Sequence, residues 1–323
     1  MSLFIIKNMH IEGANAIAGF TYGFPAITQF LGFVHALSRK VELQHRISFD
    51  GCAVMCHQHQ VHAYRGSDWD DYGFALTRNP ITDSKSISKF IKDGTPPSIV
   101  EEGKMNLCVS LLIECKGFSG GNSDQEQLIS DAIKTLALSQ RCAGGRITDI
   151  ETCQFKPMPN DASDCRKLLR PLLPGFILCD RSDYLQQHNE SNDQNMIMNW
   201  LDFSALRYRY ETLTESNSPD VEQGQWERVN KPQSGYLVPL MIGYKQISDV
   251  FAAGEVANVR DNTTPFAFTE AVYSVGEWIG SPSRVESINQ ILWRYQYSSP
   301  YYLCRAQQSI HSIESNEDFD FSY

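Results

Sequence analysis

Hydrophobic residues near the start of the chain follow two different spacings, which predict a strand followed by a helix. Residues 3–6 are all apolar, and this character continues toward Ile11, which is typical of a buried strand. Pro25 is expected in the first turn of the helix, where its missing N–H removes no hydrogen bond. The helix is predicted from apolar residues that recur every three or four positions: Ile27, Phe30, Leu31, Val34, Leu37 and Val41.

Two further apolar runs and a second helix extend the order to β-α-β followed by β-α. The runs cover residues 52–55 and 107–113, and the second helix is expected to begin at a capping box formed by Ser123 and Glu126. Its end is expected at residues 143–145, where glycine favours a left-handed turn. Its buried stripe is predicted to contain Leu128, Ile129, Ala132, Ile133, Leu136 and Ala137. This order predicts an α+β fold with a ferredoxin-like (RRM-like) head.

The strand that closes this unit has two candidates. Residues 172–179, which include Pro174 and Gly175, are the preferred choice, whereas residues 147–150 compete for the same place. On this interpretation, residues 1–180 form the head and residues 181–323 form a mixed C-terminal extension.

The extension is predicted to contain a polar helix, an extended segment and two further helices. The polar helix covers about residues 195–207, the extended segment residues 229–244, and the two helices residues 265–278 and 283–295. The apolar residues of the last two helices must be buried, either in the core of the chain or against a partner.

Composition indicates a globular chain of one large domain or two ordinary ones. It has 323 residues, of which 42% are hydrophobic, enough for a substantial core. No apolar run approaches the roughly 20 residues that span a bilayer, and the start lacks a secretory signal, so we expect a cytoplasmic protein without a membrane partner. The nine cysteines show no regular spacing, which favours reduced and mostly buried thiols.

The net charge of −10 would argue against a nucleic-acid partner, but its distribution changes that conclusion. Residues 1–180 carry 18 Lys and Arg against 19 Asp and Glu, whereas residues 181–323 carry 10 against 19. An acidic loop at residues 214–225 and an acidic tail at residues 314–323 account for part of the difference. The extension therefore suits a basic protein surface better than RNA.

A long insertion, residues 57–103, separates the second and third predicted strands. Loops this long inside a domain are usually functional or disordered. The insertion mixes cations with aromatic rings, a combination that suits RNA, although its aspartates also fit a solvated surface hairpin. The cations are Arg65, Arg78, Lys85, Lys89 and Lys92, and the rings are Tyr64, Trp69, Tyr72 and Phe74.

A cluster of thiols and imidazoles at the start of the insertion could suggest zinc. It comprises Cys52, Cys56, His57, His59 and His62. Alternation along an extended segment would place the two cysteines and the first two histidines on opposite faces, so four ligands could not converge without a sharp bend. We therefore expect no metal, and we expect no other cofactor.

Short blocks spread along the chain resemble the second Csy subunits of type I-F CRISPR surveillance complexes. They occur in the order of that family and span nearly the whole chain: G-F-P-x-x-x-x-F-x-G-F-V-H-A-L from Gly23, L-T-R-N-P from Leu76, I-V-E-E-G from Ile99, V-S-L-L from Val109, A-G-G-R-I from Ala143, L-L-P-G-F from Leu172, L-V-P from Leu237 and G-E-W from Gly276. The match fades over residues 182–230 and in the tail.

The resemblance implies a non-catalytic subunit of the repeat-associated (RAMP) RNA-binding superfamily, in which a thumb protrudes from the head. Such a subunit caps the 5′ handle of the CRISPR guide RNA (crRNA), pairs with the large subunit and packs against the first repeated backbone subunit. It contacts target double-stranded DNA only indirectly. Residues 57–103 are the candidate for the thumb.

Eight residues are candidates for RNA contact: Arg39, Arg65, Arg78, Asn79, Lys104, Gly144, Gly145 and Arg146. A guanidinium at position 78 can hold a phosphate or stack on a base, although Asn-Pro is also a strong turn signal. The glycine pair would allow close approach to a phosphate, and a helix C-cap explains Gly144 equally well. Arg39 could instead complement the C-terminal end of the first helix.

Because relatives in the wider superfamily cleave RNA with a histidine, His35 is the candidate residue for an alternative function as a metal-independent RNA endonuclease. A helical histidine flanked by Val34, Ala36 and Leu37 is more often a packed or hydrogen-bonded core residue, and the resemblance argues further against catalysis.

Overall fold

The computed structural model places four long strands and two helices in the first half of the chain, in the predicted order. They are β1 (Ser2–Asn15), α1 (Ile27–His45), β4 (Ser48–Val61), β9 (Lys104–Lys116), α3 (Ser123–Leu138) and β11 (Gly145–Pro157). The structure describes residues 2–81, 83–100, 102–118, 120, 122–193, 195–212 and 224–306. The acidic tail and most of the acidic loop fall outside these ranges.

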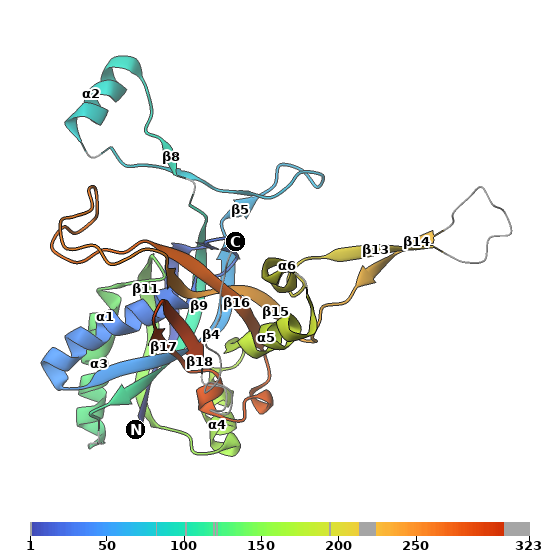
Figure 1. Cartoon of the computed structure of the whole chain (residues 1–323). Coiled ribbons are helices and arrows are strands. Elements are labelled where there is room, and N and C mark those ends of the chain that lie inside the picture. The colour runs from blue at the N-terminus through green and yellow to red at the C-terminus, as the bar shows by residue number, and fades with distance from the viewer. Residues whose placement is uncertain are drawn as a thin grey trace, which may run out of the picture.

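The four strands pair antiparallel in the order β11-β1-β9-β4. Helices α1 and α3 cover one face of this sheet (Figure 1). All six residues of the predicted α1 stripe are buried there. The opposite face is apolar at the end that carries Leu3 and Ile5, where it packs against α4 (Ala162–Leu169) and the 3₁₀ turn η1 (Arg170–Leu172).

The strand that closes this unit is not the one preferred from sequence. β11, which contains residues 147–150, pairs with β1, whereas residues 176–180 form β12 (Phe176–Asp180) on the other side of β4. Both segments are strands, and the error arose because apolar content cannot say which neighbour a strand pairs with.

Local details of both helices also differ from the prediction. Pro25 precedes α1, whose N-cap is Ala26. Asn122, rather than Ser123, caps α3, and its side chain accepts a hydrogen bond from the Asp124 N–H. In the α3 stripe, Ile133 and Ala137 are buried, whereas Leu128 is exposed. The helix ends at Leu138, because β10 (Arg141–Cys142) and β11 form a tight hairpin through the glycines expected to cap it.

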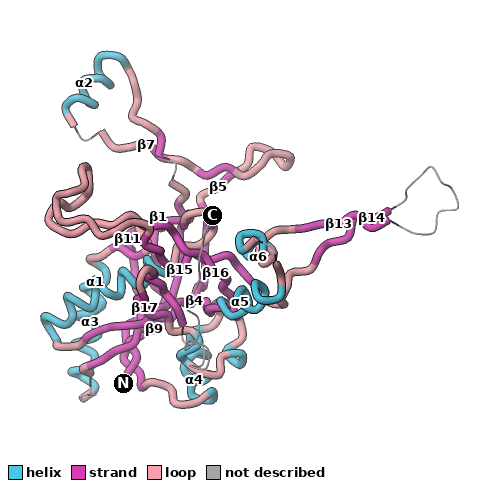
Figure 2. The backbone as a smooth tube through the Cα atoms, in the orientation of Figure 1, coloured by secondary structure: helices cyan, strands magenta, loops and turns pink. Residues whose placement is uncertain are grey.

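The C-terminal half adds strands to the same sheet. Beyond β12 the order continues through β16 (Thr269–Ile279), β15 (Leu237–Gln246), β18 (Tyr301–Ala306) and β17 (Trp293–Ser298). β17 also pairs with β4 through Trp293 and Cys52, so the strands from β4 to β17 close into a ring. Figure 2 shows these strands grouped in the body of the molecule.

Two of the three helices predicted in the extension do not form, so that part of the prediction is wrong. Residues 265–278 lie mostly in β16, and residues 283–295 contain η2 (Pro282–Arg284), η3 (Ile288–Gln290) and the start of β17. The polar helix is shorter than predicted and is confined to α6 (Met196–Leu201), which follows α5 (Ser182–Ser191). The predicted extended segment is confirmed in part by β15.

Small elements complete the described chain. They are β2 (Ile17–Ala18), β3 (Thr21–Tyr22), β5 (Ala63–Tyr64), β6 (Gly73–Phe74), β7 (Thr77–Arg78), α2 (Ser84–Asp93), β8 (Ile99–Val100), β13 (Arg207–Thr212) and β14 (Gly224–Val229). All nine cysteines are free and buried, as predicted. Within the described ranges, no helix combines the length and apolar character needed to cross a membrane.

Trp293 occupies the point where the ring of strands closes. Its side chain is fully buried, and its indole N–H donates a 3.0 Å hydrogen bond to the carbonyl of Leu178 in β12. On the neighbouring strand β16, the buried carboxylate of Glu277 forms ion pairs with Arg181 at 2.8 Å and with Arg284 at 2.6 Å. Removal of either partner of a buried ion pair of this kind is strongly destabilising, because it leaves an uncompensated buried charge.

We predict that Trp293→Ala lowers the free energy of unfolding by about 3–5 kcal/mol, because it leaves a large cavity at the closure of the ring. The matched control is Tyr297→Ala on the same strand, where the side chain is 70% exposed and the expected change is within about 0.5 kcal/mol. Urea unfolding of both variants measures the difference. Equal losses would contradict the role given to Trp293.

Candidate nucleic-acid interface

Asn15, at the end of β1, connects four elements at one end of the sheet. Its backbone N–H donates to the Ala143 carbonyl at 2.9 Å, and its side-chain oxygen accepts a 2.9 Å hydrogen bond from Lys104 Nζ. Its amide nitrogen donates to Gln29 Oε1 on α1 at 3.4 Å. The end of β1, the start of β9, the β10–β11 turn and the first turn of α1 are thereby fixed together.

Three sequence-predicted residues meet at this point: Lys104, Gly144 and Gly145. Gly144 has φ +78°, and a Cβ there would lie 2.7 Å from the Asn15 side chain. A Cβ on Gly145 would lie 2.6 Å from the carbonyl oxygen of Glu12. Packing against β1 is therefore sufficient to explain both glycines, and no RNA contact is needed to account for them. Arg146 follows them on β11 with an exposed side chain.

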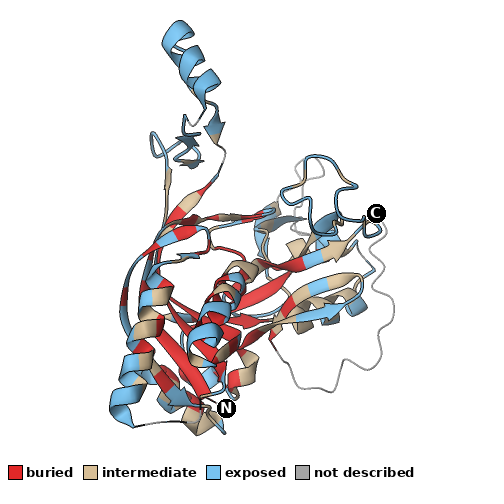
Figure 3. Ribbon diagram, turned by 90° about the vertical axis from the view of Figure 1, so that its left-hand side faces the viewer, coloured by how far each residue is buried: buried red, intermediate tan, exposed pale blue. Residues whose placement is uncertain are grey.

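The insertion between β4 and β9 leaves the body near this cluster. Because β4 continues to Val61, the insertion comprises residues 62–103 rather than 57–103, and we use these bounds from here on. Figure 3 shows that its surface is almost entirely exposed. Its root is tied to the sheet by backbone hydrogen bonds from the His62 N–H to the Lys104 carbonyl, 2.8 Å, and from the Ala16 N–H to the Gly103 carbonyl, 2.9 Å.

The structure separates the other predicted residues of the insertion into two short ladders. In the first, β5–β6, Arg65 pairs with Asp68 at 2.9 Å and lies over the Tyr72 ring, 5.2 Å from its centroid. In the second, β7–β8, Arg78 donates through Nη1 to the Pro97 carbonyl at 2.8 Å, and the Asn79 N–H donates to the Ser98 carbonyl at 3.0 Å. The hydrogen bond to Pro97 thus holds the Arg78 guanidinium in one orientation, while the residue remains exposed.

Helix α2 carries the remaining cations of the insertion. Helical spacing puts Lys85, Lys89 and Lys92 on one face and places the apolar residues Ile87, Phe90 and Ile91 on the opposite face, all of them exposed. The Asp83 carboxylate caps the helix by accepting hydrogen bonds from the side chain and backbone N–H of Ser86, and these bonds lower its pKa. The lysine face is open to an anionic ligand.

Two exposed aromatic residues at the base of the insertion were missed from sequence. Phe20 and Tyr22 lie between Gly19 and Gly23 and are 87% and 77% exposed. Phe20 stacks on Tyr273, with centroids 5.5 Å apart, and Tyr22 meets Phe74 edge to face at 6.2 Å. Aromatic residues between two glycines in a loop were the available signal, and exposed rings offer bases a stacking surface.

Arg39 and His35 lie apart from this cluster on α1. Arg39 is 12 residues beyond Ile27, which places it about 18 Å along the helix axis from the end near Asn15. Both side chains are exposed, so the interpretation of His35 as a packed core residue is wrong. Arg39 does not join the other candidate residues.

Only the cysteines of the cysteine and histidine cluster are packed in the core, and His59 is exposed. Cys52 and Cys56 are buried, which raises the pKa of each thiol to about 12. His57 Nε2 lies 2.7 Å from Ser110 Oγ, and its Nδ1 donates to the Pro174 carbonyl at 2.6 Å. In the part of the chain that the structure describes, no group of three His, Cys, Asp or Glu side chains is placed to hold a metal.

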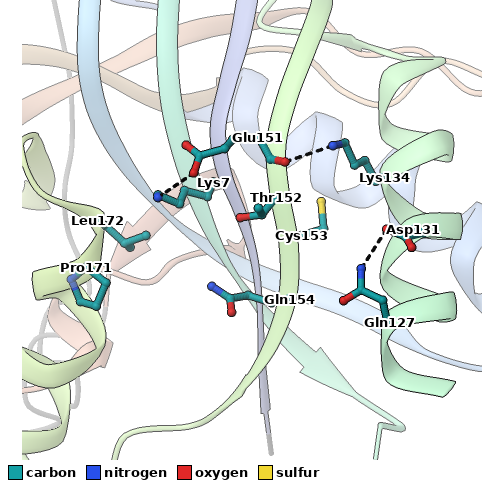
Figure 4. A pocket seen from close by; sticks show the side chains of 10 residues that line it. All are labelled: Lys7, Gln127, Asp131, Lys134, Glu151, Thr152, Cys153, Gln154, Pro171 and Leu172. Carbon is teal, nitrogen blue, oxygen red and sulfur yellow. Dashed lines mark hydrogen bonds and ion pairs between the residues drawn. The ribbon is translucent and has the colours of Figure 1, made fainter. Parts of the chain in front are cut away.

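A cavity of about 390 Å³ lies beside β11, between α3 and η1 (Figure 4). Lys7 pairs there with Glu151 at 2.9 Å, and Lys134 donates to the Glu151 carbonyl at 3.1 Å. The hydrogen bonds from Lys7 and Asn8 lower the pKa of Glu151. Its lysines already have partners within the protein, so the cavity lacks the uncompensated positive charge of the insertion.

We predict opposite effects for two glycine substitutions. Gly145→Ala should lower the free energy of unfolding by about 1–3 kcal/mol, because its Cβ would overlap the backbone of β1. Gly32→Ala, in the exposed face of α1 with open space around its Cα, should raise it by about 0.5–1 kcal/mol. Urea denaturation measures both, and a neutral Gly145→Ala would show that β11 does not pack as described.

Comparisons with known proteins agree with the resemblance seen in the sequence. Residues 4–304 match the family model described as CRISPR-associated protein (Cas_Csy2). The CRISPR-associated protein Csy2 of Pseudomonas aeruginosa (strain UCBPP-PA14) is 33% identical over 317 residues, which cover 93% of this chain and 92% of that protein. The chain therefore belongs to the Csy2 family, whose members are subunits of the type I-F CRISPR Csy complex.

Proposed function

We propose that this chain is a non-catalytic RNA scaffold of its Csy complex, and that it binds and caps the 5′ handle of the crRNA. In this role it pairs with the large subunit and packs against the first repeated backbone subunit. The assembled complex recognises foreign double-stranded DNA through the guide, so the chain contacts the target indirectly.

The insertion, acting as a thumb, is the observation that carries the proposal. It presents Arg78 and the lysine face of α2 in exposed positions, and it leaves the sheet beside Lys104 and the aromatic pair Phe20 and Tyr22. Cations hold the phosphates of single-stranded RNA, and rings stack on its bases. This arrangement supports a path for RNA from the sheet end along the thumb.

The head supports the same proposal through its topology. We propose that the head is a ferredoxin-like unit of the β-α-β-β-α-β type, a proposal supported by the strand order β11-β1-β9-β4 with α1 and α3 on one face. We assign this head to the RAMP superfamily on that order together with family membership. Arg39 lies too far along α1 to share the thumb path, so we propose a separate RNA contact there.

Reconstitution tests the scaffold role directly. The chain is co-expressed with its large subunit and a repeat-spacer RNA, and the purified RNA is mapped by 5′-end sequencing and crosslinking. We expect an intact 5′ handle that crosslinks to residues 60–147. Cleavage of the handle by this chain alone, abolished in His35→Ala, would instead establish the alternative function as a metal-independent RNA endonuclease.

A single cation on the thumb should account for a measurable part of the RNA affinity. We expect Arg78→Ala to weaken binding of the handle RNA roughly tenfold at ~0.1 M salt, because a charge-assisted contact to a phosphate is lost. The slope of log K against log salt concentration should fall by about 0.7 for that lost phosphate contact. Fluorescence anisotropy with labelled handle RNA over a salt series measures both quantities.

The control removes the same charge at the opposite end of the sheet. Lys156 is exposed on β11 opposite Leu3, far along the strand from Arg146 and the thumb root. Lys156→Ala should leave both affinity and slope unchanged. If Arg78→Ala behaves like this control, Arg78 does not belong to the RNA-binding surface.

A further inference from the structure

The sheet of the head carries a polar groove on the face opposite α1 and α3. Its volume is about 510 Å³, within the range of roughly 300–1,000 Å³ that is usual for small-molecule sites. It is lined by β1, β4, β9 and β11 close to the root of the thumb. Its apolar lining residues, Ile11, Leu107 and Cys108, are buried, so polar side chains form its exposed surface.

Strand pairing aligns four of the lining residues in a row across the sheet. Directly opposed residues of an antiparallel pair project to the same face. Asp149 of β11 opposes His10 of β1, His10 opposes Cys108 of β9, and Cys108 opposes Gln58 of β4. The imidazole of His10 thus stands between a carboxylate and an amide, and all three of these residues are exposed.

A second row lies nearer the thumb and is fixed by a hydrogen bond. Gln60 of β4 opposes Asn106 of β9, and the Gly13 N–H donates to Asn106 Oδ1 at 3.2 Å. Because the amide oxygen faces Gly13, the amide nitrogen of Asn106 is directed away from β1 as a donor. Glu12, which precedes Gly13, also lines the groove. The two rows therefore present oriented donors and acceptors side by side.

Charge separates this groove from the surface proposed to hold phosphates. Among its lining residues, all of which the structure describes, there is no lysine or arginine, whereas Glu12 and Asp149 are exposed there. Arg146 lies next to the groove, directly opposite Glu12. A negative groove repels phosphate, and neutral amides with carboxylates are groups that read the edges of bases. It also lacks the exposed tyrosine, tryptophan and arginine typical of protein–protein hot spots.

The mixture of groups favours one base over the others. The side-chain amides of glutamine and asparagine match adenine, which presents an amino group beside a ring nitrogen acceptor, and a carboxylate also accepts from that amino group. Guanine presents two adjacent acceptors on the equivalent edge and suits arginine or lysine, whereas uracil has no amino group. An exposed imidazole such as that of His10 offers a stacking surface for a base.

We propose that this groove binds one unpaired adenine of the crRNA handle. The amides of Gln58, Gln60 and Asn106 contact the edge of the base, Asp149 accepts a hydrogen bond from its amino group, and His10 stacks on its ring. The inference rests on the proposed function, because it adds a base-reading site to the phosphate contacts of the thumb.

The first test compares single-stranded probes that differ only in the base. Fluorescence anisotropy measures binding of the full chain to labelled oligoadenylate, to oligouridylate and to an oligomer of purine riboside, which lacks the 6-amino group. All have equal length. Oligoadenylate should bind about tenfold more tightly than either of the others, because only adenine completes the hydrogen bonds of the groove. This comparison requires no protein variant.

Two variants then locate the preference in the groove. The double variant Gln58→Ala/Gln60→Ala should weaken oligoadenylate binding about tenfold without changing the salt dependence, because it removes no charge. Asp149→Ala should weaken it as well. That direction is diagnostic, because removing a carboxylate that does not touch the base would leave RNA affinity unchanged or raise it by reducing repulsion of the phosphates.

The matched control for the charge is Asp131→Ala on α3, which covers the other face of the sheet. It should leave oligoadenylate affinity unchanged or slightly raised. Circular dichroism and the thermal midpoint of each variant should match the wild type, because the replaced side chains are exposed.

The outcomes distinguish this inference from the function on which it rests. A preference for oligoadenylate that both groove variants lose supports the inference. Equal affinity for the three probes overturns it while the scaffold role stands, since RNA still binds, and a preference that both variants retain also overturns it. Failure of the chain to bind the handle RNA or any probe would overturn the scaffold role together with the inference.

Discussion

Closure of the strand ring at Trp293 is the interaction on which the rest of the structure depends. The residue pairs with Cys52 of the head, and its indole N–H bonds the Leu178 carbonyl across the interior. β12 pairs with β4 on one side and β16 on the other, so the C-terminal half continues the sheet of the head. Asp180 strengthens this junction, because its buried carboxylate binds Arg305 on β18 at 2.8 Å. The two halves therefore share one core.

Two projecting elements, the thumb and the β13–β14 ribbon, lie outside this shared core (Figures 1 and 2). The thumb leaves one end of the sheet, where the Asn15 side chain joins β9 and α1, and the ribbon leaves the α5–α6 segment beside β16. Each is fixed at its root, and most side chains on each are exposed. Substitutions on either element should leave the core intact, because neither element contributes to the closure at Trp293.

The sequence predicts elements best where one face is strictly apolar. The stripe of α1 was correct at every position because helical spacing there coincides with burial. β16 was misassigned because Val272, Val275 and Ile279 also fit helical spacing, while the intervening Ser274 and Glu277 are buried. Those polar side chains are tolerated because partners remote in sequence satisfy them: Ser182 lies 2.7 Å from Ser274, and Arg181 neutralises Glu277. Such long-range compensation has no local signal.

The same limit applies to the candidate site. Blocks of sequence identified the family, and the long separation of two predicted strands indicated the insertion, yet only the fold shows that Lys104 and Gly144 meet through Asn15. Phe20 and Tyr22 were missed because exposure, which makes them available, is invisible in a list of apolar residues. Rings that stay exposed on the two projecting elements contribute no burial energy to the isolated chain, which supports the proposal that the chain works within an assembly. The uncovered surfaces are thus as informative about assembly as the buried core is about folding.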